Sequence, residues 1–221
     1  MTGQPLLEAK GLVKTFGRVQ ALRGASFAVH PGEVVALIGD NGAGKTVLVE
    51  CLSGVLRPDA GEIAVDGRPV DLESPLVAMG CGIETVHQDL ALADDLDAPA
   101  NLYLGRELLK PGPLGWLGIL DRRRMRAEAP RALDELGVTL QDPRAPVVAL
   151  SGGERQGVAL ARSVMWVSKV VLLDEPAAAL GVGQRRQLLD VVRRLRDGGV
   201  AVVYVSHSAP EALEVADRIE V

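Results

Sequence analysis

One short segment constrains the fold of this chain more than any other. The apolar run 34–38 is typical of a buried strand, GDNGAGKT follows at 39–46, and a helical pattern continues over 46–56. In this G-x-x-x-x-G-K-[ST] pattern, backbone N–H groups curl around a phosphate and the helix N-terminus adds its positive dipole end. A glycine-rich turn that only starts a helix is the alternative, but chance produces the pattern in about one chain in a hundred of this length. We therefore predict a phosphate site here.

Each residue of the segment has an expected part in that site. Lys45 is predicted to neutralise β- and γ-phosphate oxygens, and Thr46 to ligate Mg²⁺. The remaining residues are expected to surround the phosphates with their backbone: Gly39, Asp40, Asn41, Gly42, Ala43 and Gly44.

A second apolar run, 170–173, ends in Asp174, Glu175 and Pro176. Ligands bind at the carboxyl ends of parallel strands, so we expect this acidic pair beside the phosphate loop. Asp174 is suited to holding a water on Mg²⁺, and Glu175 to activating or orienting the attacking water. Taken alone, the cluster also fits an ordinary helix start. The nearby phosphate loop is what favours the catalytic interpretation.

The segment LSGGERQ at 150–156 predicts a helix N-terminus, with Ser151 as N-cap and Glu154 completing a capping box. A capping box does not explain Gly152 and Gly153, because each glycine in a first turn costs up to about 1 kcal/mol relative to alanine. Paired glycines there indicate a close approach to the backbone. A second anion at this helix N-terminus is the ligand we expect.

The order of strands and helices predicts an α/β fold with a parallel sheet covered on both faces. We interpret residues 1–221 as one domain, with a phosphate-binding core and β subdomain at 1–88 and 163–221 and a helical subdomain at 89–162. Strands are expected at 6–16, 21–29, 33–39, 62–67, 167–176 and 201–207, and late helices at 184–199 and 209–219.

Composition excludes several classes of protein. The formal charge of −5 argues against nucleic acid as a partner, because binding phosphate backbones requires a basic surface. Cys51 and Cys81 have no nearby histidine, so a zinc site is not expected. No apolar run approaches the roughly 18 residues needed to span a bilayer. We expect a soluble, cytoplasmic protein.

Together, these segments resemble the nucleotide-binding cassette of ABC transporters over essentially the whole chain. LSGGERQ is similar to the family signature, GDNGAGKT to its phosphate loop and VVLLDEP to its acidic strand. The resemblance implies a P-loop NTPase core, that is, a RecA-like parallel sheet with an antiparallel β region, plus an inserted α-helical subdomain. It also implies that Phe16 stacks on adenine, that Gln88 contacts Mg²⁺ or the lytic water, and that His207 contacts the γ-phosphate.

The same resemblance implies ATP and Mg²⁺ as cofactors and ATP hydrolysis as the activity. Two cassettes would form an ATP-dependent homodimer, in which the signature of one closes over the γ-phosphate of the other. The dimer would energise a separate integral membrane permease at the inner face of the cell membrane. Segments 87–108, with the loop-containing insertion that follows, and 179–182 are similar to the cassettes of bacterial importers of fructose, ribose or xylose. An extracytoplasmic sugar-binding protein is then an indirect partner.

One departure from the family pattern concerns Ala178–Gly181. Most members have a Ser-Ala-Leu-Asp-like segment there, whose aspartate crosses the dimer interface, so we expect cross-talk between the two ATP sites to differ. Members also usually continue with another strand beyond residue 221, so we expect the chain to be a fragment.

The main alternative is a soluble ABC-type ATPase not coupled to transport. Chromosome-type members insert a very long coiled coil between phosphate loop and signature, whereas Ser151 follows Lys45 by only 106 positions. Ribosome-type members carry two cassettes on one chain. A small-molecule kinase, a third alternative, has no use for LSGGE.

Overall fold

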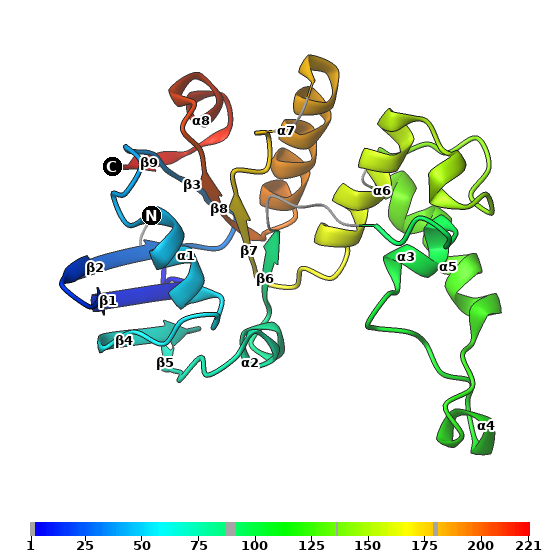
Figure 1. Ribbon diagram of the computed structural model, residues 1–221, viewed down its shortest axis with the longest axis horizontal. Helices are drawn as coiled ribbons and strands as arrows, with labels where there is room; N and C mark the ends of the chain where they lie inside the picture. The colour runs from blue at the N-terminus through cyan, green and yellow to red at the C-terminus, as the bar shows by residue number, and fades with distance from the viewer. Residues whose placement is uncertain (1–2, 87–91, 136, 179–180) are drawn as a thin grey trace. The chain divides into compact units, whose positions relative to one another are not determined.

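The computed structural model describes most of the chain and falls into two compact units (Figure 1). Unit 1 comprises residues 1–88 and 167–221, and unit 2 comprises residues 89–166. The described residues are 3–86, 92–135, 137–178 and 181–221.

Unit 1 contains an antiparallel sheet with the strand order β2-β1-β4-β5. Strands β1 and β2 form a hairpin in which Phe16 pairs with Val19. Gly17 has φ 59°, the left-handed conformation that a two-residue hairpin loop takes at its first central position. The strands are β1 (Leu7–Phe16), β2 (Val19–Val29), β4 (Ala60–Val65) and β5 (Arg68–Pro69).

The second sheet of unit 1 is parallel, with the strand order β6-β7-β8-β3-β9. Every neighbouring pair in it is parallel. Both faces of this sheet are covered, so nearly every side chain of its central strands is buried. These strands are therefore continuous apolar runs. The strands are β3 (Val34–Leu37), β6 (Ile83–Val86), β7 (Val170–Asp174), β8 (Ala201–Val205) and β9 (Arg218–Glu220).

Helices of unit 1 pack on this sheet: α1 contacts β7, α7 contacts β8 and α8 contacts β3. The core is almost entirely aliphatic and runs between the two sheets, from Leu7 and Leu12 of β1 to Leu172 of β7 and Val203 of β8. The helices are α1 (Lys45–Leu52), α2 (Pro75–Gly80), α7 (Val182–Asp197) and α8 (Ala209–Val215). The predicted α/β class, with a parallel sheet and an antiparallel β region, is confirmed.

The predicted helix over 209–219 is wrong at its C-terminal end. Helix α8 ends at Val215, and β9 begins at Arg218. Residue 218 pairs with Val35 of β3, so a long-range parallel ladder overrides the local helical pattern.

Unit 2 is helical and has its own core. Helices α3, α5 and α6 contact one another around apolar side chains that include Leu102, Met125 and Val158. Helix α6 continues to Val164, so unit 2 ends at Trp166 rather than at Arg162, where the sequence division was placed. The helical elements are α3 (Ala98–Leu102), α4 (Pro113–Trp116), α5 (Arg122–Glu135), the 3-10 turn η1 (Val147–Ala149) and α6 (Gly152–Val164).

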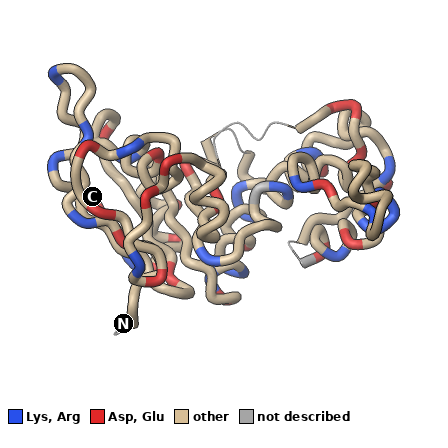
Figure 2. The backbone as a smooth tube through the Cα atoms, turned by 90° about the horizontal axis from the view of Figure 1, so that it is seen from below, with Lys and Arg blue, Asp and Glu red and all other residues tan. Residues whose placement is uncertain are grey.

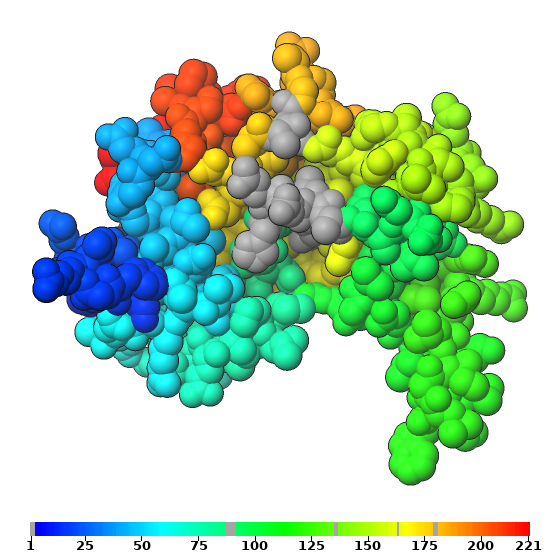
Figure 3. Space-filling model, in the orientation of Figure 1, coloured from blue at the N-terminus to red at the C-terminus, as the bar shows by residue number. Residues whose placement is uncertain are grey.

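A narrow hairpin, residues 109–120 and here called the arm, projects from the rest of unit 2 (Figure 3). Leu109 and Leu120 form an antiparallel bridge at its base, and α4 lies in its tip. Trp116 in the tip is 96% exposed. The sequence pattern predicts a loop here, and α4 is a single short turn within it.

Charged residues of both signs are scattered along the backbone of each unit (Figure 2). Among the described residues, no helix is long and apolar enough to cross a membrane.

Candidate functional site

Three loops of unit 1 start from one edge of the parallel sheet. Val205 of β8 pairs with Leu37 of β3 on one side and with Asp174 of β7 on the other. These three strands therefore end level with one another (Figure 1). The phosphate loop, the residues after Asp174 and the turn that carries His207 all leave the sheet at this edge. Carboxyl ends of parallel strands are where α/β proteins bind ligands.

The phosphate loop depends on glycine backbone geometry. Gly39, Gly42 and Gly44 all have positive φ, and a Cβ on Gly44 would lie 2.7 Å from the carbonyl oxygen of Ala21. Gly44 is also the N-cap of α1, and no side chain caps this helix. The first-turn N–H groups of α1 are thus not satisfied by a side-chain cap, as an anion site requires.

The ammonium group of Lys45 lies over this loop. Its Nζ donates to the carbonyl oxygens of Gly39, at 2.6 Å, and of Asp40, at 2.9 Å. Residues 40–43 and Thr46 are exposed, and Lys45 is half-buried. The Lys45 ammonium and the N-terminus of α1 therefore lie at the same loop.

Glu175 and His207 contact each other. Nε2 of His207 contacts Oε1 of Glu175. Asp174 is half-buried and immediately precedes Glu175 at the end of β7. Glu175 has φ 49° and donates its backbone N–H to the carbonyl of Val205 at 3.1 Å. A left-handed backbone at a non-glycine residue costs roughly 1–3 kcal/mol and is typical of functional sites. It aims the Glu175 carboxylate at His207.

A buried network that the sequence did not predict lies behind this pair. The carboxylate of Glu211 in α8 is 2.9 Å from Nη1 of Arg185, and it accepts hydrogen bonds from Tyr204 and Ser206. Its sequence signal is weak: Glu211 occupies the same helical face as Ala212 and Val215, both buried. A carboxylate on an apolar helix face indicates a partnered, structured site.

Phe16 lies at the end of β1, and its ring is 46% exposed. Nζ of Lys14 is 5.8 Å from the ring centroid. The ring is therefore not core filler. Its exposed face is open to stacking by a planar group.

The signature segment lies in unit 2, at the N-terminus of α6. The predicted capping box is present: Ser151 Oγ accepts from the N–H of Glu154 at 3.3 Å, and the Glu154 carboxylate accepts from the N–H of Ser151 at 3.0 Å. Hydrogen bonds from the N–H of Gln141 and from Ser151 lower the pKa of Glu154. An added Cβ on Gly152 or Gly153 would meet nothing within 4 Å. No contact among the described residues requires these glycines, and both are exposed.

Two sequence predictions concern residues outside the described ranges. The first is that Gln88 contacts Mg²⁺ or the lytic water. The second is the departure from the family pattern at 178–181, of which residues 179 and 180 lie outside the described ranges. Gly181 itself is described: it is the N-cap of α7, and its N–H donates to the side chain of Gln184 at 2.9 Å.

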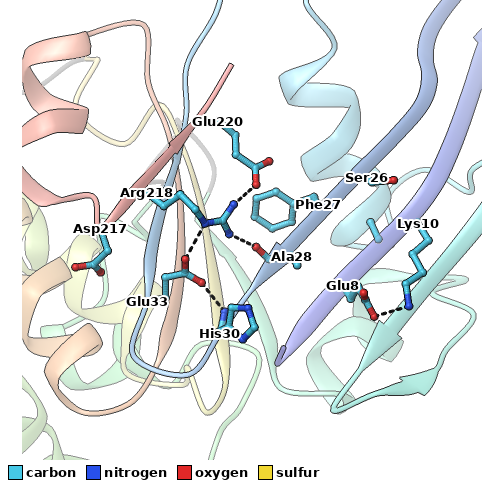
Figure 4. Close-up of a pocket in the computed structure, with 11 residues that line it drawn as sticks. Glu8, Lys10, Ser26, Phe27, Ala28, His30, Glu33, Asp217, Arg218 and Glu220 are labelled. Carbon is cyan, nitrogen blue, oxygen red and sulfur yellow. Dashed lines mark hydrogen bonds and ion pairs between the residues drawn. The ribbon is translucent and has the colours of Figure 1, made fainter. Parts of the chain in front are cut away.

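A pocket of about 800 Å³ lies elsewhere on unit 1, and none of the predicted site residues lines it (Figure 4). Arg218 of β9 is at its centre, where it donates to Glu33 at 2.9 Å and pairs with Glu220. The hydrogen bond to Glu33 raises the pKa of Arg218. Glu33 also accepts the N–H of His30 at 2.8 Å. This network ties β9 to the start of β3 and is structural.

Comparison with known proteins identifies the family. The family model described as ABC transporter matches residues 22–178. The fructose import ATP-binding protein FrcA of Rhizobium meliloti is 48% identical over 100% of this chain and 86% of its own length. The xylose/arabinose import ATP-binding protein XylG of Sulfolobus acidocaldarius is 43% identical over 98% of this chain and 84% of its own. The ribose import ATP-binding protein RbsA 1 of Rubrobacter xylanophilus is 42% identical over 99% of this chain, which spans only 42% of that relative.

Solved structures agree with the sequence comparison. An ATP-binding cassette of an ABC transporter in its ADP conformation has a TM-score of 0.82 at 26% identity, covering 98% of this chain and 87% of that one. A nucleotide-free cassette from an ABC transporter has a TM-score of 0.80 at 25% identity, covering 97% and 86%. The resemblance predicted from the three motifs is thus confirmed. The chain belongs to the ABC transporter family and is an ATP-hydrolysing cassette of that family.

Proposed function

We propose that this chain is the ATP-hydrolysing subunit that energises a separate membrane permease for monosaccharide uptake. The observation that carries the proposal is the common sheet edge from which the phosphate loop, Asp174–Glu175 and His207 emerge. Relatives named as fructose, xylose/arabinose and ribose import proteins support a sugar as the transported substrate.

In this proposal the phosphate loop holds the nucleotide. Backbone N–H groups of residues 39–46 and the N-terminus of α1 bind the phosphates, and Lys45 moves its ammonium from the loop carbonyls to the β- and γ-phosphate oxygens. The exposed ring of Phe16 stacks on the base. Stacking is tolerant of base identity, so ATP and GTP are expected to bind alike.

The residues present fit Mg²⁺. Magnesium in nucleotide sites takes one or two protein oxygens together with phosphate and water oxygens. The described residues contain no group of three or more His, Cys, Asp and Glu placed to hold a metal. They do contain the Thr46 hydroxyl and the Asp174 carboxylate, which would hold Mg²⁺. When bound, the ion supplies neutralisation of charge on the phosphate oxygens.

Hydrolysis in this proposal depends on Glu175 and His207. The carboxylate of Glu175 accepts a proton from the attacking water, and His207 holds that carboxylate in place through the contact between the two side chains. The left-handed backbone at Glu175 fixes the direction of its side chain before substrate arrives.

The second half of the site comes from another cassette. The exposed segment Ser151–Glu154 of one cassette closes over the γ-phosphate bound by its partner, and the paired glycines let the phosphate approach the backbone of α6. The working unit is then a homodimer, bound to the permease at the cytoplasmic face of the membrane. An extracytoplasmic sugar-binding protein delivers the substrate, and nucleic acid has no part.

The test is Glu175→Gln, with Glu214→Gln, an exposed glutamate of α8, as the matched control. We expect Glu175→Gln to bind ATP as the wild type does, to lose hydrolysis by about a hundredfold or more, and to accumulate as a dimer with ATP. A monomer at saturating Mg-ATP, with hydrolysis unchanged, would overturn both the role of Glu175 and the dimer. If deleting the gene leaves the uptake of fructose, xylose and ribose unchanged, the sugar assignment alone is overturned.

A further inference from the structure

Glu211 is a buried acid that none of the roles above uses. Only 8% of it is exposed. Its Oε1 is 2.9 Å from Nη1 of Arg185 in α7. Its Oε2 accepts from the hydroxyl of Tyr204 at 3.4 Å and from the hydroxyl of Ser206 at 3.3 Å. Three segments, α7, β8 and α8, therefore meet on one carboxylate.

Ser206 connects this carboxylate to the turn that carries His207. Its hydroxyl donates to Glu211 and accepts the backbone N–H of Ser208 at 3.0 Å, while its own N–H donates to the carbonyl of Leu37 at 3.2 Å. Both neighbours of His207 in the chain are thus anchored. The imidazole lies between them and reaches Glu175.

These residues line one pocket of about 250 Å³ in unit 1. Glu175 and His207 lie on its lining together with Arg185, Ser206 and Glu211. The pocket thus joins the catalytic pair to the buried network behind it.

The tyrosine of the network remains a hydrogen-bond donor at neutral pH. Burial, and next the charge of Glu211, raise the pKa of Tyr204 well above its ordinary value. The phenol therefore stays protonated and keeps donating to Glu211.

We propose that Glu211 is a positioning residue for ATP hydrolysis, which holds the His207 turn through Ser206 and so keeps His207 against Glu175. This inference rests on the proposed function, because it assigns a role relative to the proposed catalytic pair. Arg185 anchors the carboxylate from α7, so the position of His207 depends on how α7 and α8 pack. Glu211 touches no substrate and acts only through its neighbours.

The experiment compares Glu211→Ala with Glu214→Ala, one turn further along α8, whose side chain is 52% exposed and pairs with Arg193. We expect Glu211→Ala to lower kcat for ATP by about tenfold to a hundredfold, the scale of a misplaced catalytic group, with KM changed less than about twofold. The substitution leaves the phosphate loop unchanged, so KM should stay nearly the same. Glu214→Ala should change neither constant.

A double-mutant cycle separates positioning from a general loss of structure. If Glu211 acts through His207, Glu211→Ala in a His207→Ala background should lower kcat no further. An equal loss in both backgrounds would overturn the inference, as would unchanged kcat in Glu211→Ala. If Glu211→Ala does not fold, the same double-mutant cycle with Ser206→Ala tests the inference. That substitution removes only one hydroxyl. A wild type without ATPase activity, or His207→Ala with full activity, would instead overturn the proposed function.

Discussion

Two helix N-termini in this molecule are built in opposite ways. Helix α1 begins after Gly44 with no side-chain cap, no acidic residue in its first turn, and Lys45 over the adjoining loop. Helix α6 begins with a complete capping box, in which Ser151 and Glu154 satisfy each other's backbone N–H groups. One end offers uncapped N–H groups and a cation, whereas the other has a side-chain cap on the N–H of Glu154 and carries a carboxylate in its first turn.

This difference predicts unlike roles for the two helix ends in the proposed homodimer. The α1 end is ready to receive an anion by itself, so unit 1 should bind ATP without help. At the α6 end, the carboxylate of Glu154 adds a negative charge to the first turn, and this charge repels a phosphate. It should therefore act only when a nucleotide already held by a phosphate loop is brought to it, as in the proposed homodimer.

The largest effect should come from Lys45→Ala in the isolated cassette. Removing a charged hydrogen-bond donor from the phosphate loop should weaken ATP binding by about 2–3 kcal/mol, or roughly 30- to 160-fold. Lys110→Ala, in the arm of unit 2, is the control and should leave affinity unchanged. Equal affinity of Lys45→Ala and wild type by calorimetric titration would show that α1 is not the primary anion site.

A smaller and different effect is expected from Ser151→Ala. Loss of the N-cap should lower the free energy of unfolding by about 1 kcal/mol and the thermal midpoint by about 2–4 °C, while ATP affinity of the isolated cassette stays the same. Ser208→Ala is a fair control, since Ser208 is the N-cap of α8 but its side chain makes no cap hydrogen bond. A drop in affinity as large as that of Lys45→Ala would erase the contrast between the two ends.

Phe16→Ala should weaken ATP and GTP binding alike, by up to about 1 kcal/mol, or fivefold. The ring is 46% exposed, so the substitution leaves the core intact and stability nearly unchanged. Val19→Ala, directly across the hairpin from Phe16, controls for changes in the turn. Unchanged nucleotide affinity would remove Phe16 from the site.

The smallest effect concerns pH and the cap of α6. Hydrogen bonds lower the folded-state pKa of Glu154, so its stabilising contribution is present above the unfolded-state pKa of about 4.3 and is lost as pH falls through the lower folded-state value. The stability difference between wild type and Glu154→Gln should therefore shrink between about pH 5 and pH 3. Urea unfolding at a series of pH values measures it. A difference that does not change over this range would contradict the assignment.

Features encoded in contiguous segments were predictable from the sequence. The strand–loop–helix of the phosphate site, the capping box of α6 and the apolar strands β7 and β8 each depend on neighbouring residues, and the structure has them where the patterns predict. The roles of Lys45, Glu175 and His207 in hydrolysis stay predictions until the variants are measured.

Features that depend on distant partners were not predictable. Strand β9 exists because Arg218 and Ile219 pair with Val35 and Ala36 of β3, and nothing in the local sequence reveals that ladder. Glu211 was missed for a related reason: Arg185 lies on another helix, and only the packing of α7 on α8 brings the two side chains to 2.9 Å.

Both tryptophans of the chain lie in unit 2, and this makes its emission spectrum selective. Trp166 lies edge-on to Tyr103, with ring centroids 5.3 Å apart, and its indole N–H donates to the carbonyl of Leu102 at 3.0 Å. Its fluorescence will change when unit 2 melts, whereas Trp116 in the arm emits as a hydrated indole before and after. Unit 1 is silent at wavelengths that excite tryptophan alone. A change in emission on adding ATP would therefore report an event in unit 2 rather than the filling of the phosphate loop.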